Sequence, residues 1–204
     1  MQEIWHKLSA DEMLTVLEAV NQEINPISFH IESTMVRSQN LSFYHDYKLY
    51  ELTDFSAVPP AKKFALYAPA KKAEMMVWTN EPIYQINSIA PIQLNEQTIA
   101  DYVRFFFHYV RGRHGRFLIV ETVDEIKWQN DPPPQGRKAM QDILSPVTLI
   151  NRNDAGDYIL TAFMVFKDAL FKTRVTVDQK GIVTLSDEEL KVEGLPVLTD
   201  QLVA

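Results

Sequence analysis

The sequence predicts an α+β protein, in which a helix and a proline-broken β region precede a long buried helix wrapped by a curved antiparallel sheet. Three observations predict this class. Apolar residues occupy nearly the whole circumference of a helix expected at 95–112. Short β-like runs broken by proline fill the region 27–94. Four β runs with short connections follow Pro146.

The first element is an N-terminal helix. Ser9 and Glu12 have the spacing of a capping box, in which each side chain accepts from a free backbone N–H of the first turn. Apolar residues follow at helical spacing at Met13, Val16, Leu17, Val20 and Ile24. The helix is therefore predicted over 10–25, and Pro26 ends it.

Short strands are predicted next, at 27–36, 47–55, 63–67 and 75–79. Residues 80–82 and 90–91 contain proline and are interpreted as breaks. We place a domain boundary near Leu94, which gives two domains, 1–94 and 95–204. Aromatic residues are dense in the first domain. They can stack on bases or sugars, but core packing is the favoured interpretation for Phe43, Tyr44, Tyr47, Tyr50, Phe55, Trp78 and Tyr84.

The central helix is predicted over 95–112. Asn95 suits the N-cap, Glu96 suits the positive end of the helix dipole, and Gly112 suits the position after the C-cap. One stripe contains Ile99, Tyr102, Val103, Phe106 and Val110, and it is widened by Phe105, Phe107 and Tyr109. A helix that is apolar on nearly all sides must be covered on more than one side.

After this helix, a strand is predicted at 116–123, a loop at 130–136 and one or two helical turns at 137–144. The proline-rich loop is interpreted as a plain connector rather than a lid over a pocket. Four strands at 147–151, 158–166, 170–178 and 182–190 then form an antiparallel meander.

Alternation in the third of these strands shows which face is buried. Phe171, Thr173, Val175 and Val177 share one face, and Lys172, Arg174, Thr176 and Asp178 share the other. Val183 and Leu185 continue the apolar face in the last strand. This face needs a cover, and the helix at 95–112 is apolar enough to provide it.

From residue 95 to residue 197 this order of elements resembles the cystatin-like and nuclear-transport-factor-like (NTF2-like) cone folds. The resemblance is one of element order and implies a fold without a function. Members of that group include ketosteroid isomerases and polyketide cyclases, as well as plain binding or dimerisation modules.

Composition narrows the function classes. The net charge is −7 and the pI is near 5.2, so we expect no nucleic-acid partner, because such proteins use a surplus of Lys and Arg. The absence of cysteine excludes thiolate chemistry and is typical of a cytoplasmic protein. No run approaches the ~20 apolar residues of a membrane span, and no signal-peptide pattern is present. The five scattered histidines and the missing nucleotide loops predict neither metal nor cofactor.

Two residues are candidates for acid–base catalysis inside the cone. Glu121 shares strand parity with Phe117 and Ile119, so it is either a buried acid with a raised pKa or, as we favour, a strand-end carboxylate that reaches solvent. His108 on the central helix is a candidate proton shuttle, although a hydrogen-bonded structural histidine is the commoner case.

Basic residues gather after the central helix and form a candidate anion site: Arg104, Arg111, Arg113, His114 and Arg116. Guanidinium groups suit phosphates and carboxylates, but the negative end of a helix dipole also attracts arginine.

The favoured function is a non-catalytic module that binds a small apolar, amphipathic or anionic ligand, or a protein partner, as a homodimer. The alternative is a small isomerase or lyase that acts inside the cone, and a third idea is a structural subunit of a larger assembly. A cavity of about 300 Å³ or more with convergent polar groups favours ligand binding or chemistry. A filled interior with an apolar patch elsewhere favours a protein partner.

Overall fold

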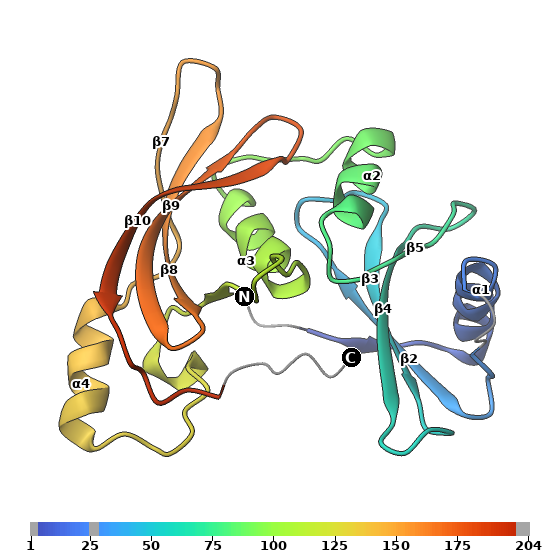
Figure 1. Cartoon of the computed structure of the whole chain (residues 1–204). Coiled ribbons are helices and arrows are strands. Elements are labelled where there is room, and N and C mark those ends of the chain that lie inside the picture. The colour runs from blue at the N-terminus through green and yellow to red at the C-terminus, as the bar shows by residue number, and fades with distance from the viewer. Residues whose placement is uncertain (1–3, 25–28, 199–204) are drawn as a thin grey trace. The chain divides into compact units, whose positions relative to one another are not determined.

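The computed structural model describes residues 4–24 and 29–198, and the chain divides into two compact units, 1–93 and 94–204 (Figure 1). The described residues form four α-helices and two antiparallel sheets. The predicted α+β class is therefore confirmed. No helix among these residues is long and apolar enough to cross a membrane.

The first unit contains a five-stranded antiparallel sheet in the order β1-β2-β3-β4-β5. Its strands are β1 (His6–Lys7), β2 (Thr34–Asn40), β3 (Lys48–Asp54), β4 (Ala61–Tyr67) and β5 (Glu74–Met75). Strand β2 begins well after the predicted start at 27, and residues 27 and 28 lie outside the described part. The strand predicted at 75–79 is reduced to the two residues of β5.

Helix α1 (Ala10–Asn21) starts as predicted, with both hydrogen bonds of the Ser9–Glu12 capping box present. It ends four residues earlier than predicted. The side chain of Asn21 donates to the carbonyl of Phe29 (2.9 Å) and accepts from its N–H (2.8 Å), so the last helical residue binds the returning chain. The predicted end at residues 25 and 26 falls outside the described part. The buried face of α1 packs on β2 and β3 through Val16, Leu17, Val20, Val36, Tyr50 and Leu52.

Helix α2 (Glu81–Ile89) occupies the segment interpreted as a break at 80–82, so that interpretation is wrong. Pro82 lies in the first turn, where its missing N–H has no helical partner to lose. The buried Tyr44 hydroxyl donates to Asn87 of this helix (2.5 Å). Core packing is confirmed for Phe43, Tyr44, Tyr47 and Tyr50, whereas Phe55 and Trp78 are exposed.

In the second unit, helix α3 (Ile99–Tyr109) is shorter than the predicted 95–112. Asn95 does accept from the backbone N–H groups of Gln97 (2.8 Å) and Thr98 (3.1 Å), but this caps a turn that precedes the helix. At the other end Val110 is already extended, and Gly112 pairs with Gly115 in a tight turn instead of ending the helix.

The predicted meander is confirmed by the pairing of consecutive strands: β7 (Thr148–Arg152), β8 (Tyr158–Phe166), β9 (Ala169–Val177) and β10 (Val183–Val192). Strand β6 (Leu118–Ile119) pairs with the far end of β8 and is much shorter than the predicted strand at 116–123. A 3₁₀ turn, η1 (Val123–Glu125), and helix α4 (Pro134–Ile143) follow it. Helix α4 begins inside the predicted loop at 130–136.

The sheet of the second unit is buried on its α3 face. The other face is covered where α4 and η1 pack, whereas Lys172 and Arg174 on that face are exposed. On one face, Tyr158, Leu160, Met164, Val175 and Val177 are at most 1% exposed. The hydroxyl of Tyr102 on α3 donates to the carbonyl of Gly181 in the β9–β10 turn (2.6 Å). The other face packs on α4 and η1 through Phe163, Val165, Leu170, Val123, Met140 and Leu144. Figure 1 shows α3 and α4 on opposite sides of this sheet.

Candidate functional site

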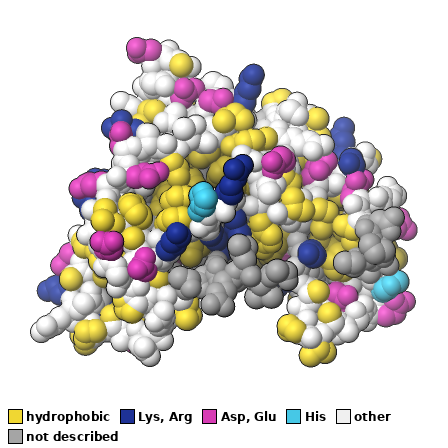
Figure 2. All heavy atoms as spheres, viewed as in Figure 1, with side chains coloured by type: hydrophobic (Ala, Val, Ile, Leu, Met, Phe, Trp, Pro, Cys, Tyr) yellow, Lys and Arg dark blue, Asp and Glu magenta, His cyan; other side chains and the backbone are white. Residues whose placement is uncertain are grey.

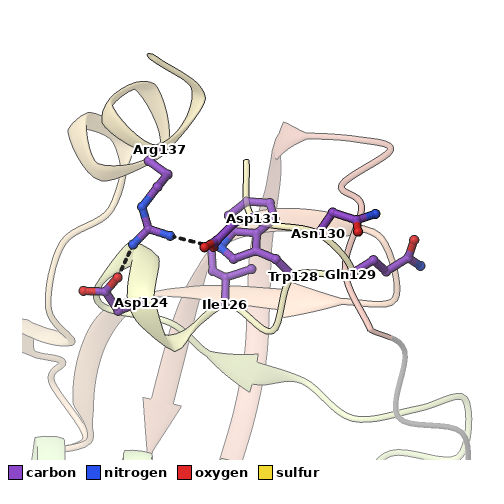
Figure 3. Close-up of a pocket in the computed structure, with 7 residues that line it drawn as sticks. All are labelled: Asp124, Ile126, Trp128, Gln129, Asn130, Asp131 and Arg137. Atoms are coloured by element: carbon purple, nitrogen blue, oxygen red, sulfur yellow. Dashed lines mark hydrogen bonds and ion pairs between the residues drawn. The ribbon is translucent and has the colours of Figure 1, made fainter. Parts of the chain in front are cut away.

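A pocket of about 680 Å³ opens between η1, the segment that follows it and the start of α4 (Figure 3). We call it the Trp128 pocket. Its lining residues are Asp124, Ile126, Trp128, Gln129, Asn130, Asp131 and Arg137. The volume lies within the range of small-molecule sites, which is about 300–1,000 Å³.

Backbone contacts with the segment 195–198 hold one wall of the pocket. Trp128 pairs with Val197 in an isolated β-bridge. Gln129 donates from its backbone N–H to Pro196 (2.8 Å) and from its side chain to the carbonyl of Val197 (3.0 Å). This wall of the pocket is therefore held in place by residues that lie far away in the sequence.

Arg137 projects from the first turns of α4 and lies between two carboxylates, as Figure 3 shows. Its Nη2 donates to Asp124, and its Nη1 donates to Asp131 (3.3 Å). The two aspartate side chains are 78% and 88% exposed. Ion pairs this exposed add little to stability, so their consequence is geometric: they fix the guanidinium at the rim.

Trp128 contributes an indole ring whose polar atom is already used. Its Nε1–H donates to the carbonyl of Val123 (3.3 Å), and the half-buried ring packs against the core on this side of the sheet. What the ring offers to the pocket is thus apolar surface.

Glu121, the first catalytic candidate, lies outside the Trp128 pocket and forms a two-pronged ion pair. Arg104 donates to its two oxygens from Nη2 (2.7 Å) and Nε (2.9 Å), and the N–H of Val147 donates as well (2.7 Å). Burial by itself would raise the pKa of Glu121, but these donors hold the pKa below its usual value. This is the opposite of the shift that proton transfer near neutral pH requires.

His108, the second catalytic candidate, is exposed on α3, and its ring lies 4.6 Å from that of Tyr109. Its backbone carbonyl accepts from Nη2 of Arg116 (2.6 Å). The histidine lines neither the Trp128 pocket nor the ion pair of Glu121.

The five residues of the predicted anion site lie on α3 and in the segment 111–116 that follows it. Arg104 contacts Asp101 and Glu121, and Arg116 contacts the last turn of α3. Arg113 and His114 are exposed in the turn between Gly112 and Gly115, and Arg111 precedes that turn. Arg116 thus donates to a carbonyl at the negative end of the α3 dipole, which is the structural alternative to anion binding.

On the face in Figure 2, acidic and basic side chains are interspersed rather than gathered into one basic area. Within residues 4–24 and 29–198, no group of three His, Asp or Glu side chains could hold a metal ion.

Thr173 is the polar residue on the α3 face of the sheet. It is 2% exposed, and its hydroxyl has no hydrogen-bond partner among the described residues. An unsatisfied buried hydroxyl costs about 1–3 kcal/mol, and valine has nearly the same shape. Removal of this hydroxyl therefore tests whether the space between the sheet and α3 is filled by side chains.

We expect Thr173→Val to raise the free energy of unfolding by about 1 kcal/mol, measured by urea denaturation. Thr176→Val on the opposite face of β9 is the matched control, with an expected change below about 0.5 kcal/mol. A loss of stability in Thr173→Val would show that the hydroxyl has a partner, such as water or a ligand, on the α3 face of the sheet.

The sequence analysis missed the Trp128 pocket. A signal was present, because Trp128 is followed by Gln129, Asn130 and Asp131 and then by three prolines. An aromatic ring beside planar hydrogen-bonding side chains, in a loop stiffened by proline, is a recognisable ligand-site composition. The same pattern does not predict that Arg137 lines the pocket, since the position of Arg137 depends on where α4 begins.

No protein-family model matches the chain, and comparison with curated proteins and with solved structures finds no significant similarity.

Proposed function

We propose that this protein is a non-catalytic binding module and that its second unit takes a small ligand in the Trp128 pocket. The observation that carries the proposal is the pocket itself: an open space of about 680 Å³ with one aromatic ring and several planar polar side chains around it.

The electrostatics of the catalytic candidates favour binding over chemistry. A cone isomerase would need an acid or base with a pKa moved toward neutrality. Glu121 is instead held as a carboxylate by Arg104, and neither Glu121 nor His108 lines the pocket.

Helix α3 and the antiparallel meander β7–β10, which follows it after β6, η1 and α4, support a cystatin-like assignment for residues 95–197. The cone folds that this unit resembles include dimerisation modules, so a homodimer belongs to the proposal. Native mass spectrometry of the full chain would show a dimer, and a monomer at all concentrations would remove this part.

The ligand site can be tested with the three tryptophans as reporters, since each gives one indole N–H signal in a ¹H–¹⁵N correlation spectrum. Trp5 and Trp78 belong to the first unit and Trp128 to the second. We expect members of a small-molecule fragment library to shift the Trp128 signal and leave the other two in place. Substitution of each tryptophan by phenylalanine assigns the signals.

In ligand-observed saturation-transfer spectra, Trp128→Ala should abolish the signals of these fragments, and Trp78→Ala is the matched control, because Trp78 is 37% exposed and lies in the other unit. Circular dichroism of both variants checks that they fold. The proposal falls if no fragment shifts the Trp128 signal selectively.

A further inference from the structure

Each charged side chain that lines the Trp128 pocket already has a charged partner within the pocket. Nη1 and Nη2 of Arg137 each contact one aspartate, which leaves a formal sum of −1 on these three side chains. A strongly anionic ligand would meet two carboxylates and a net negative charge. The arrangement therefore disfavours an anionic ligand.

Hydrogen-bonding capacity remains around the rim. Asp124 and Asp131 contact Arg137 through Oδ1. In the part of the chain that the structure describes, their Oδ2 atoms, the Oε1 of Gln129 and the amide of Asn130 make no hydrogen bond. The pocket thus offers several acceptors and one amide donor at exposed positions.

The aromatic ring adds an apolar surface to this set. Because the Nε1–H of Trp128 is bound to Val123, the ring is held in one orientation and recognises a ligand through its surface rather than its N–H. A ligand that satisfies every group must have hydroxyls that both donate and accept, together with a flat apolar side.

We propose, on the basis of the binding function above, that the Trp128 pocket binds a neutral carbohydrate. A pyranose ring has a C–H face that packs on an indole and hydroxyls around its edge. Its hydroxyls donate to the Oδ2 atoms of Asp124 and Asp131 and pair with the amides of Asn130 and Gln129. The openness of the site, whose aspartates are 78% and 88% exposed, suits one residue of a longer glycan.

The test is an NMR titration of the full chain with four probes: methyl α-glucoside, methyl β-galactoside, methyl α-mannoside and N-acetylglucosamine. We expect at least one sugar to shift the Trp128 indole signal selectively. Trp128→Ala should raise the Kd of that sugar about tenfold, as measured from its saturation-transfer signals. Asn130→Ala should weaken binding about threefold, and because Asn130 is exposed this change leaves folding intact.

Failure of the inference and failure of the proposed function give different results. If fragments of other classes shift the Trp128 signal and none of the four sugars does, the carbohydrate assignment is overturned and the binding site stands. If amines or carboxylates bind more tightly than every sugar, the assignment is likewise overturned. If neither sugars nor fragments shift the signal, both proposals fall. Equal shifts of all three indole signals would show unspecific contact and also overturn the assignment.

Discussion

Arg37→Met is expected to lower the free energy of unfolding of the first unit by about 3 kcal/mol. Arg37 donates to Glu51 across β2 and β3 from Nη2 (2.5 Å) and Nε (3.2 Å), and Lys62 contacts the other oxygen (3.1 Å). The side chain of Glu51 is only 5% exposed. The substitution leaves a nearly buried carboxylate with Lys62 and the weakly donating Thr53 hydroxyl (3.4 Å), and it also removes the guanidinium that lies over Trp5.

The loss should depend on pH. Burial would raise the pKa of Glu51, but the hydrogen bonds from Arg37 and Lys62 hold the pKa below its usual value. A lowered folded pKa gives stability that is present above the unfolded pKa of about 4.3 and disappears as the pH falls through the folded value. The difference between wild type and Arg37→Met should therefore be full at neutral pH and shrink under acid conditions.

The measurement is urea denaturation followed by tryptophan fluorescence, in a background where Trp128 is phenylalanine and only the first unit reports. Lys62→Met is the matched control, with an expected loss of about 1 kcal/mol, because Lys62 is half-exposed. Equal losses for the two variants at every pH would contradict the assigned role of Arg37.

Arg104→Met is expected to destabilise the second unit by about 2 kcal/mol. The substitution removes the two N–H groups of Arg104 that donate to Glu121, whose side chain is 15% exposed. Glu121 then keeps the hydrogen bond from the Val147 N–H. The pKa of Glu121 is lowered in the folded protein, so this contribution also is present above the unfolded pKa and is lost in acid.

The unfolding of the second unit is followed by tryptophan fluorescence in a background where Trp5 and Trp78 are replaced by phenylalanine. Arg113→Met is the control, since Arg113 is exposed in the turn after α3 and its loss should cost less than about 0.5 kcal/mol. An Arg104→Met protein that is as stable as wild type at neutral pH would show that Glu121 does not need its partner. That result would reopen a role for Glu121 as an acid.

Local patterns were sufficient where one short-range rule decides the outcome. The Ser9–Glu12 capping box forms as predicted, because both partners lie in one turn. Alternation placed Val175 and Val177 on a buried face, and the turn residues separated the four strands of the meander. Element ends were less accurate, as at α3, where Asn95 caps a turn that precedes the helix.

The candidate site could be predicted only in part. Sequence reasoning chose Glu121, His108 and the arginines by residue type, and it could not foresee that Arg104 would bind Glu121, which is 17 residues away. The Trp128 pocket depends on even longer separations, since its wall is held by Pro196 and Val197. Such contacts form when distant segments pack, and no local period records them.

By itself the sequence determined the α+β class, the first helix, the meander and the burial of most aromatic residues, because hydrophobic periodicity and capping act within a few residues. Tertiary structure alone decided that α4 and η1 pack on the second face of this sheet, that the carboxylate of Glu121 is held in its charged form, and that Arg137 lies between Asp124 and Asp131. The physical reason is that burial, ion pairing and pocket shape are set by partners that only folding brings together.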